Sequence, residues 1–332
     1  MSNNINYTTV SALTSIQKLQ ELMAKSIIGQ EQVINRIISC LISDGNLLLE
    51  GLPGLAKTRA INALAKNMDL GLSRVQFTPD LLPSDITGTE IYQNQGEENF
   101  VFQKGPIFNN LILADEINRA PAKVQSALLE AMQERQVTVA GTTYELPSPF
   151  FVMATQNPIE QEGTYPLPEA QMDRFLMHVI VNYPSIDAEL EVLRLVRSEE
   201  KLTAEKVKKE VEKLPKDIIF QARKEVQEVH VSEAIEKYIV ALVYATRTPE
   251  KYSEDLDKWI DVGCSPRATI ALDKVARVQA WLNGRDFVKP EDIQTVIKDV
   301  FRHRIVSSFE ANALGISKEQ IIDELLSKVA VA

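Results

Sequence analysis

The chain has 332 residues, of which 45% are hydrophobic and 25% charged, and its formal net charge is −10. This composition excludes disordered and fibrous proteins, and the length predicts two packed units. The acidic balance argues against a broad basic surface, so we do not expect DNA or RNA as the partner.

Few residues are available for a metal centre or a nucleophilic triad. Cys40 and Cys264 lie far apart, with no Cys or His at the spacing of a zinc site, and we expect both to be reduced thiols. The histidines are scattered as well: His178, His230 and His303. Residues 1–10 lack the pattern of a secretory signal, and no apolar run approaches the ~20 residues that span a bilayer. We therefore expect a cytoplasmic protein without a membrane span.

Helical and strand patterns alternate in the first half of the chain. Apolar residues at helical spacing between Ser15 and Ser43, interrupted by Gly29, predict two helices joined by a turn. Short apolar runs predict buried parallel strands at residues 47–49, 111–114, 150–154 and 177–181, with helices between them at 58–68 and 122–134. This alternation predicts a P-loop-type α/β/α core with a parallel sheet.

The second half is different in character. After Pro184 the strand patterns disappear and long amphipathic patterns follow, among them residues 234–245 and 266–282. We therefore predict an α/β domain over residues 1–183 and an all-α domain over residues 184–332. Residues 198–216 are dense in Lys and Glu, which favours the solvated face of a helix and its linker over an interaction arm.

Two stretches of the α/β part have the pattern of β-hairpins. Residues 89–102 carry a polar, Gly-containing tip at 94–97 between apolar arms, and residues 136–146 carry a tight turn at 140–142. Each is either a loop decoration or an insert that contacts a partner, and two hairpins on one core favour the second interpretation.

A glycine-rich segment, Gly-Leu-Pro-Gly-Leu-Ala-Lys-Thr at residues 51–58, follows the first predicted strand and begins a helix. This is the context of a phosphate-binding loop, in which backbone N–H groups and a helix N-terminus face phosphate oxygens. Lys57 would neutralise the β- and γ-phosphates, and Thr58 would ligate magnesium. The alternative is an ordinary turn before a helix. The residues expected to contact the nucleotide are Gly51, Pro53, Gly54, Leu55, Ala56, Lys57 and Thr58, with Ala56 standing where the pattern has its last glycine.

Two carboxylates, Asp115 and Glu116, end the strand predicted at residues 111–114. Asp115 is placed to hold magnesium and Glu116 to accept a proton from the attacking water as general base. An acidic turn after a buried strand is common by itself, but its position after a phosphate loop predicts ATP binding and hydrolysis.

Three further polar residues follow or precede predicted elements. Asn157, after the strand at 150–154, would contact the γ-phosphate or the lytic water, unless it only forms an Asn-Pro turn. Arg174 precedes the last strand at the domain rim, where it either reaches a neighbour's phosphate or pairs with an acid. Arg267 lies at the start of a helix capped by Ser265 and suits an anion.

The order of these motifs resembles the MoxR family of AAA+ ATPases over nearly the whole chain. The matching segments are residues 28–30, 51–58, 77–88, 114–132, 155–158, 169–175 and 264–268. The segments 114–121 and 169–175 are the specific ones, whereas the phosphate loop marks only the superfamily. Ala56 resembles the family's own version of that loop.

The resemblance implies roles for single residues. Residues 51–58 would be Walker A, Asp115 and Glu116 Walker B, Asn157 sensor 1, Arg174 an arginine finger and Arg267 sensor 2. Ile28 and Gly29 would line the adenine. In the helix-2-insert group the lid is repositioned, so the resemblance leaves open whether Arg267 serves its own subunit or the adjacent one.

The resemblance also implies properties of the whole protein. It implies ATP and Mg²⁺ as cofactors, hexameric rings, a helix-2 insert at residues 89–102 and a pre-sensor insert at 136–146. Family members are described as chaperone-like factors that act with von Willebrand factor A-domain proteins on complex assembly or metal insertion. Two other interpretations remain: a nucleotide-gated scaffold with little turnover, motivated by Ala56, and a nucleic-acid-associated motor.

Overall fold

The computed structural model describes residues 11–52, 54–55, 57–92, 100–158, 163–204 and 213–331. Several of the predictions fall outside these residues. They concern the N-terminal residues 1–10, the tip of the first hairpin, residues 205–212 of the Lys- and Glu-rich stretch, and Pro53 and Ala56 of the phosphate loop.

A parallel sheet of five strands forms the centre of the first half, in the order β2-β5-β8-β1-β9. Four strands lie where the apolar runs predicted them, and the fifth, β2, was missed. Strand β2 reads Leu-Ser-Arg-Val-Gln and buries only Val75, because it lies at the edge of the sheet and has no continuous apolar run. The bounds are β1 Leu47–Gly51, β2 Leu72–Gln76, β5 Leu111–Asp115, β8 Phe151–Gln156 and β9 Met177–Val181.

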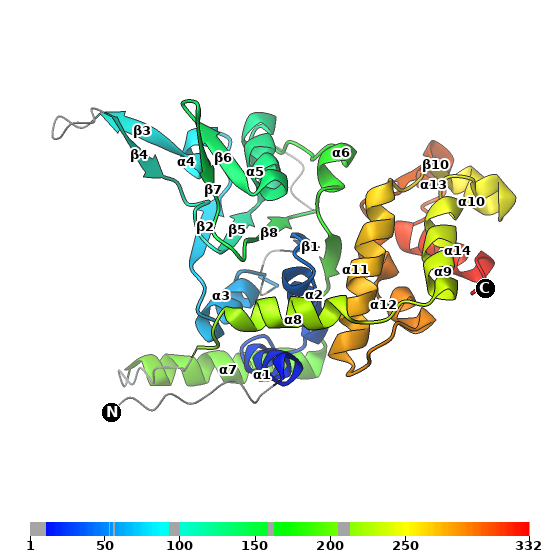
Figure 1. Ribbon diagram of the computed structural model, residues 1–332, viewed down its shortest axis with the longest axis horizontal. Coiled ribbons are helices and arrows are strands. Elements are labelled where there is room, and N and C mark those ends of the chain that lie inside the picture. The colour runs from blue at the N-terminus through cyan, green and yellow to red at the C-terminus, as the bar shows by residue number, and fades with distance from the viewer. Residues whose placement is uncertain are drawn as a thin grey trace.

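Helices cover both faces of this sheet (Figure 1). Alternate residues of one strand face opposite sides, so Leu47 and Leu49 pack with α1, α2 and α3, whereas Leu48 packs with α4 and α5. The predicted α/β/α core with a parallel sheet is therefore confirmed. The helices are α1 Ala12–Ala24, α2 Glu31–Ile42, α3 Lys57–Asn67, α4 Pro83–Thr87, α5 Ala122–Glu134 and the short α6 Glu169–Met172, with a 3₁₀ turn at Ile117–Arg119.

Both predicted hairpins are present. Strands β3 (Gly88–Tyr92) and β4 (Phe100–Lys104) pair antiparallel, as do β6 (Gln136–Val139) and β7 (Thr142–Glu145). The rings of Phe102 and Tyr144 stack with their centroids 4.2 Å apart, so an aromatic contact joins one hairpin to the other.

The second half is helical, with one difference from the prediction. Strands β10 (Ile260–Val262) and β11 (Val306–Ser307) form a short antiparallel pair, so strands do not vanish after Pro184. Their β-branched residues favour extended backbone, but the runs are too short to stand out in the sequence. The helices are α7 Ile186–Ala204, α8 Asp217–Gln227, α9 Glu233–Ala245, α10 Glu254–Trp259, α11 Pro266–Leu282, α12 Pro290–Phe301, α13 Phe309–Ala313 and α14 Lys318–Lys328, with a 3₁₀ turn at Pro249–Lys251.

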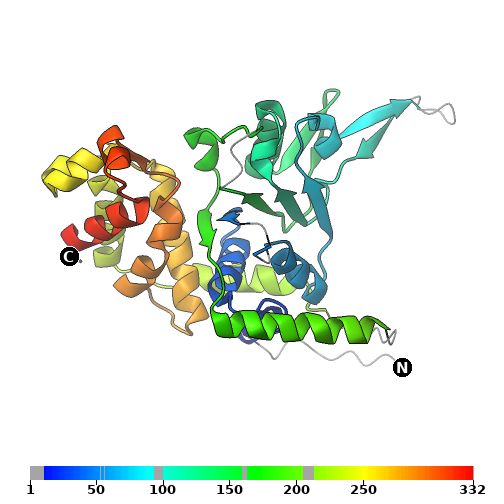
Figure 2. The ribbon, with the colours of Figure 1, turned by 180° about the vertical axis from the view of Figure 1, so that it is seen from behind.

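Helices α9 to α14 form a lobe beside the α/β part, whereas α7 and α8 run along it (Figures 1 and 2). Helix α8 contacts α1 and α2, and Glu199 of α7 pairs with Arg59 of α3 at 2.6 Å. The domain boundary at residue 183 stays a prediction, since helices on its C-terminal side pack on the first part. No helix in the described part of the chain is both long and apolar enough to span a bilayer.

A buried cluster of charges joins the lobe to the sheet. The Arg36 guanidinium of α2 lies 2.6 Å from the Asp299 carboxylate of α12, and both side chains are at most 5% exposed. Arg302 also contacts Asp299, at 3.1 Å, and donates a hydrogen bond to the backbone carbonyl of His178 in β9. Asp299 therefore pairs with Arg36 of α2 and with Arg302, the residue that follows α12, and its pair with Arg36 fixes α12 against α2.

Replacing Asp299 by Ala should strongly destabilise the protein, because Arg36 and Arg302 would lose their shared counter-charge in a buried site. Breaking a buried pair in this way typically costs about 3–5 kcal/mol. Asp323→Ala is the matched control, since its pair with Lys298 is exposed and such pairs contribute about 0–1 kcal/mol. Urea denaturation followed by circular dichroism measures both; equal losses in the two variants would contradict the role given to Asp299.

Candidate functional site

The polar residues predicted at the ends of β1, β5 and β8 meet at one edge of the sheet, because the carboxyl ends of parallel strands lie together. They surround a cavity of about 330 Å³. Its lining consists of Gly54, Leu55, Lys57, Thr58, Arg59, Asp115, Glu116 and Asn157. The structure thus brings together residues that are far apart in the sequence.

The loop after β1 depends on two glycines. Gly54 has a φ of +84°, a conformation that L side chains rarely adopt. A Cβ atom at Gly51 would lie 2.9 Å from the carbonyl oxygen of Val181, so only glycine allows β1 and β9 to approach so closely there. The Lys57 amine donates hydrogen bonds to the carbonyls of Gly51 (2.6 Å) and Gln156 (3.2 Å), which holds it between the ends of β1 and β8.

The two carboxylates after β5 are held by different partners. Asp115 is buried, and its carboxylate accepts hydrogen bonds from the Thr155 hydroxyl at 2.7 Å and from the Arg74 guanidinium at 2.7 Å. The same Thr155 oxygen accepts the backbone N–H of Glu116 at 2.9 Å. Thr155 therefore ties the end of β5 to β8 and orients the Asp115 carboxylate.

Glu116 adopts a left-handed backbone conformation, with φ 57° and ψ 51°. Such a conformation is uncommon for a residue other than glycine and is often found at functional sites. Its carboxylate accepts a hydrogen bond from the Gln76 amide at 2.8 Å and lies 3.2 Å from the Arg119 guanidinium. Glu116 lines the cavity at this turn.

Four of these partners were missed by sequence reasoning: Arg74, Gln76, Arg119 and Thr155. The first two belong to β2, which was not predicted, and they reach the site only because Gln76 is in register with Asp115. Thr155 directly follows the strand predicted at residues 150–154, and this position at the carboxyl end of a strand was a signal that it could belong to the site.

The structure does not bring Arg174 and Arg267 to this edge. They line a second cavity, of about 410 Å³, where β1 and β9 begin. Because Leu47 is in register with Met177 and Gly51 with Val181, the two cavities lie at opposite ends of the same strands. At about 3.3 Å per residue, four steps along a strand span roughly 13 Å. The cations lining the second cavity are Arg135, Arg174, Arg267, Lys274 and Arg304, with Asp44 and Asp173 as the acids.

Ile28 and Gly29 lie between α1 and α2, outside the lining of either cavity. A Cβ atom at Gly29, whose φ is +72°, would meet the Cβ of Ala188 at 2.6 Å. The Gln30 amide donates to the carbonyl of Asn182 at 2.9 Å. These contacts hold the turn beside the segment that leaves β9 at its carboxyl end, which is the edge where the phosphate loop lies.

The cysteines and histidines do not form a reactive site in the described part of the chain. Burial raises the pKa of Cys264 to about 12 and raises that of Cys40 further, so neither is a thiolate at neutral pH. Burial and the Arg304 charge hold the pKa of His303 well below its usual value. No group of three or more His, Cys, Asp or Glu side chains among the described residues is arranged to hold a metal ion.

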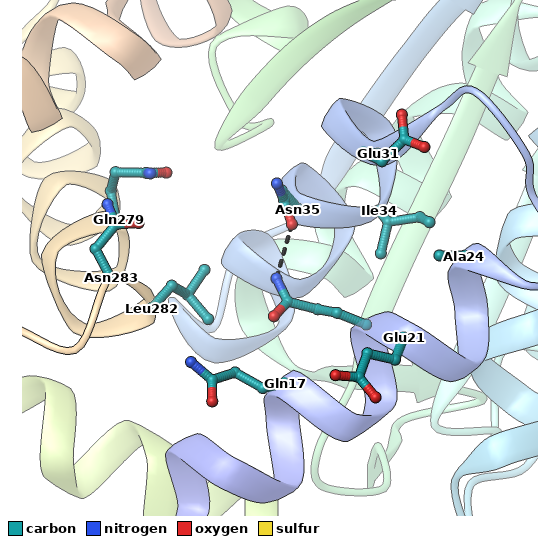
Figure 3. A pocket seen from close by; sticks show the side chains of 10 residues that line it. Gln17, Glu21, Ala24, Glu31, Ile34, Asn35, Gln279, Leu282 and Asn283 are labelled. Carbon is teal, nitrogen blue, oxygen red and sulfur yellow. Dashed lines mark hydrogen bonds between the residues drawn. The ribbon is translucent and has the colours of Figure 1, made fainter.

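A third cavity, of about 490 Å³, lies between α1, α2 and the end of α11 (Figure 3). Carboxamides and carboxylates dominate its lining, and the Gln20 amide donates to Asn35 at 2.7 Å. No Lys or Arg of the described residues lines it, so it lacks the charge that a phosphate requires. The lining residues are Gln17, Gln20, Glu21, Ala24, Glu31, Ile34, Asn35, Gln279, Leu282 and Asn283.

Comparisons with known proteins agree with this geometry. Residues 46–177 match the model of the ATPase family associated with various cellular activities, and residues 255–325 match that of the AAA lid domain. A crystal structure from Cytophaga hutchinsonii, described as that of a candidate ATPase, superposes with a TM-score of 0.88 at 50% identity. The match covers 97% of this chain and 96% of that one.

Three sequences are similar to most of this chain, and two of them are named for MoxR. The chaperone MoxR1 of Mycobacterium tuberculosis is 47% identical over 92% of this chain and 79% of its own length. The protein YeaC of Bacillus subtilis is 45% identical over 95% and 94%, and the protein MoxR of Methylorubrum extorquens is 31% identical over 94% and 92%. The chain belongs to the MoxR family of AAA+ ATPases.

Proposed function

We propose that the protein binds ATP together with Mg²⁺ at the carboxyl edge of the sheet and hydrolyses it to ADP and phosphate. The observation that carries the proposal is the convergence of Lys57, Asp115, Glu116 and Asn157 on one cavity. Phosphoryl transfer requires a cation that binds the phosphates, a carboxylate that holds the metal ion, a base that accepts the proton of the attacking water, and a polar group that orients this water.

The residues present suit magnesium. Thr58 and Asp115 both line the cavity and offer hard oxygen donors, and Thr155 already fixes the direction of the Asp115 carboxylate. Magnesium in phosphate sites takes only one or two protein carboxylates and completes its shell with water and phosphate, so a larger acidic cluster is not needed. When bound, the ion would neutralise charge that develops on the phosphate oxygens.

The chain's own residues would perform the remaining steps. The Lys57 amine would exchange its carbonyl partners for the β- and γ-phosphates. Glu116 would accept the proton of the water that attacks the γ-phosphate in line, and Asn157 would orient that water or the phosphate. The position of Glu116 supports this role, since it lines the cavity at a left-handed turn directly after β5.

Arg174 and Arg267 would complete the site of a neighbouring subunit. Their cavity lies at the amino end of β1 and β9, too far from Lys57 for service in the same chain. A head-to-tail contact that places this face against the next subunit's phosphate loop closes into a ring if its rotation allows. Membership of the AAA+ ATPases supports a ring, for which we propose six subunits, with Arg267 acting across the interface as Arg174 does.

We further propose a chaperone-like role in the remodelling or maturation of protein complexes in the cytoplasm. The support is the name of the Mycobacterium tuberculosis relative, and von Willebrand factor A-domain proteins are the partners that the family resemblance implies. The first hairpin offers a contact surface, since Tyr92 and Phe100 are more than half exposed and pack edge to face.

Replacing Lys57 by Ala should abolish useful ATP affinity, because the triphosphate keeps its negative charge and loses the amine that neutralises it. Equilibrium titration with a fluorescent ATP analogue measures the loss. Lys66→Ala is the matched control, since Lys66 is an exposed lysine of the same helix. Wild-type affinity in Lys57→Ala would show that this loop is not the phosphate site.

Replacing Glu116 by Gln should preserve ATP binding and slow hydrolysis by about 10² to 10⁴-fold, because the amide cannot accept the water's proton. Single-turnover phosphate release measures this, with Glu130→Gln, an exposed residue of α5, as the control. An unchanged rate would reject Glu116 as the base, and the absence of turnover in the wild type would favour the scaffold interpretation.

Replacing Arg174 by Ala should leave ATP binding intact and lower turnover by about 10³ to 10⁵-fold, the usual effect of removing an arginine that stabilises this transition state. Mixing tests its action across the interface. Arg174→Ala subunits keep Lys57, and Lys57→Ala subunits keep Arg174. A mixture of the two inactive proteins should therefore regain activity at interfaces where an intact Lys57 faces an intact Arg174. No recovery in co-assembled rings would leave Arg174 as a structural residue.

A further inference from the structure

Asp173, the residue before Arg174, is the meeting point of three side chains. One of its carboxylate oxygens accepts a hydrogen bond from the Arg304 guanidinium at 2.8 Å. The other accepts one from the Ser265 hydroxyl at 2.8 Å and lies 3.9 Å from the Arg267 guanidinium. Asp173 lies in the same connection as Arg174 and contacts the lobe that carries Arg267.

On one side Asp173 is held rigidly. Arg304 is 2% exposed and also donates to the backbone carbonyls of Phe175 (2.6 Å) and Leu176 (3.1 Å), at the start of β9. Burial lowers the pKa of this guanidinium and the Asp173 charge counteracts it, as expected for a buried charge that needs its counter-charge. Arg304 comes from the lobe, between α12 and β11, so it joins the lobe to the Asp173 carboxylate and to the backbone just before β9.

On the other side Asp173 holds the first turn of α11. Ser265 is the N-cap of that helix, and its oxygen also accepts the backbone N–H of Arg267 at 3.2 Å. One hydroxyl therefore links the Asp173 carboxylate to the backbone of Arg267. Because hydrogen bonds to a charged acceptor are short and directional, they fix where this helix begins relative to Arg174.

We propose that Asp173 is a positioning residue that sets the spacing of Arg174 and Arg267, and so decides how well both arginines engage the neighbouring subunit's nucleotide. The proposal rests on the proposed function, in which those two arginines act across the interface. In this proposal Asp173 does not contact the nucleotide itself: its carboxylate carries the same charge as a phosphate and is engaged by Arg304 and Ser265.

Replacing Asp173 by Asn tests the proposal, because the amide keeps the size of the side chain and removes its charge. We expect kcat to fall by about 10²-fold, the effect of a displacement of roughly 1 Å in a catalytic array, with unchanged ATP affinity in the variant's own site. Asp273→Asn is the matched control, since Asp273 pairs with Arg277 within α11 and does not line this cavity. A wild-type kcat in Asp173→Asn would overturn the proposal.

A second pair of variants removes the contact from the other side. Ser265→Gly keeps a residue that helix N-caps tolerate but deletes the hydroxyl, whereas Ser265→Thr retains it. We expect Gly to lower kcat at constant ATP affinity and Thr to restore it. Equal rates in the Gly and Thr variants would contradict the link through Ser265.

Mixing separates positioning from a purely structural role. Asp173→Asn subunits with intact Lys57 should regain activity when mixed with Lys57→Ala subunits that keep Asp173. Recovery absent from co-assembled rings, or ATP affinity lost in Asp173→Asn itself, would make Asp173 structural and overturn the proposal. Wild-type turnover in Arg174→Ala would reject the role of Arg174 in the proposed function. Wild-type turnover in the Asp173 and Ser265 variants, together with lost turnover in Arg174→Ala, would reject only the positioning role of Asp173.

Discussion

The parallel pairing of β1 with β8 and β9 is the constraint on which the rest of this structure depends. It places all carboxyl ends at one edge of the sheet, and the contact between Gly51 and Val181 requires glycine at that edge. Helices cover both faces of the sheet, and the polar residues of the two cavities lie at its two ends. The lysine and carboxylates lie at one end and the arginines at the other.

The distance between the two cavities bears on how charge is distributed over the protein. The chain is acidic overall, with a net charge of −10, yet five cations line one cavity at the amino edge. A cavity of that kind attracts an anion, and within one subunit the phosphate loop is at the far end of the same strands. In the proposed ring each subunit would complete the site of the next, and hydrolysis would therefore depend on assembly.

The junction between the lobe and the sheet contains buried charges beside its apolar contacts. Arg36, Asp299, Arg302 and Arg304 are all nearly buried there, and each is paired or bonded to backbone carbonyls. Buried pairs contribute little net stability because desolvation offsets their attraction, but their geometry is strict. Strict geometry would serve the proposed function, in which the lobe presents Arg267 at a fixed distance from Arg174.

The sequence by itself determined the elements whose signals are local. Apolar runs located four of the five strands, and helical periodicity located α5 and α11. Residues 51–58 and the pair Asp115-Glu116 predicted a phosphate site. Strand pairing is not local, so only the tertiary structure decided that Arg74 and Gln76 of the edge strand reach the carboxylates. The tertiary structure also decided that Arg174 and Arg267 share a cavity away from Lys57. The distance between that cavity and Lys57 depends on the direction of the strands. The cavity itself depends on contacts between residues more than a hundred positions apart, such as Asp173 and Arg304.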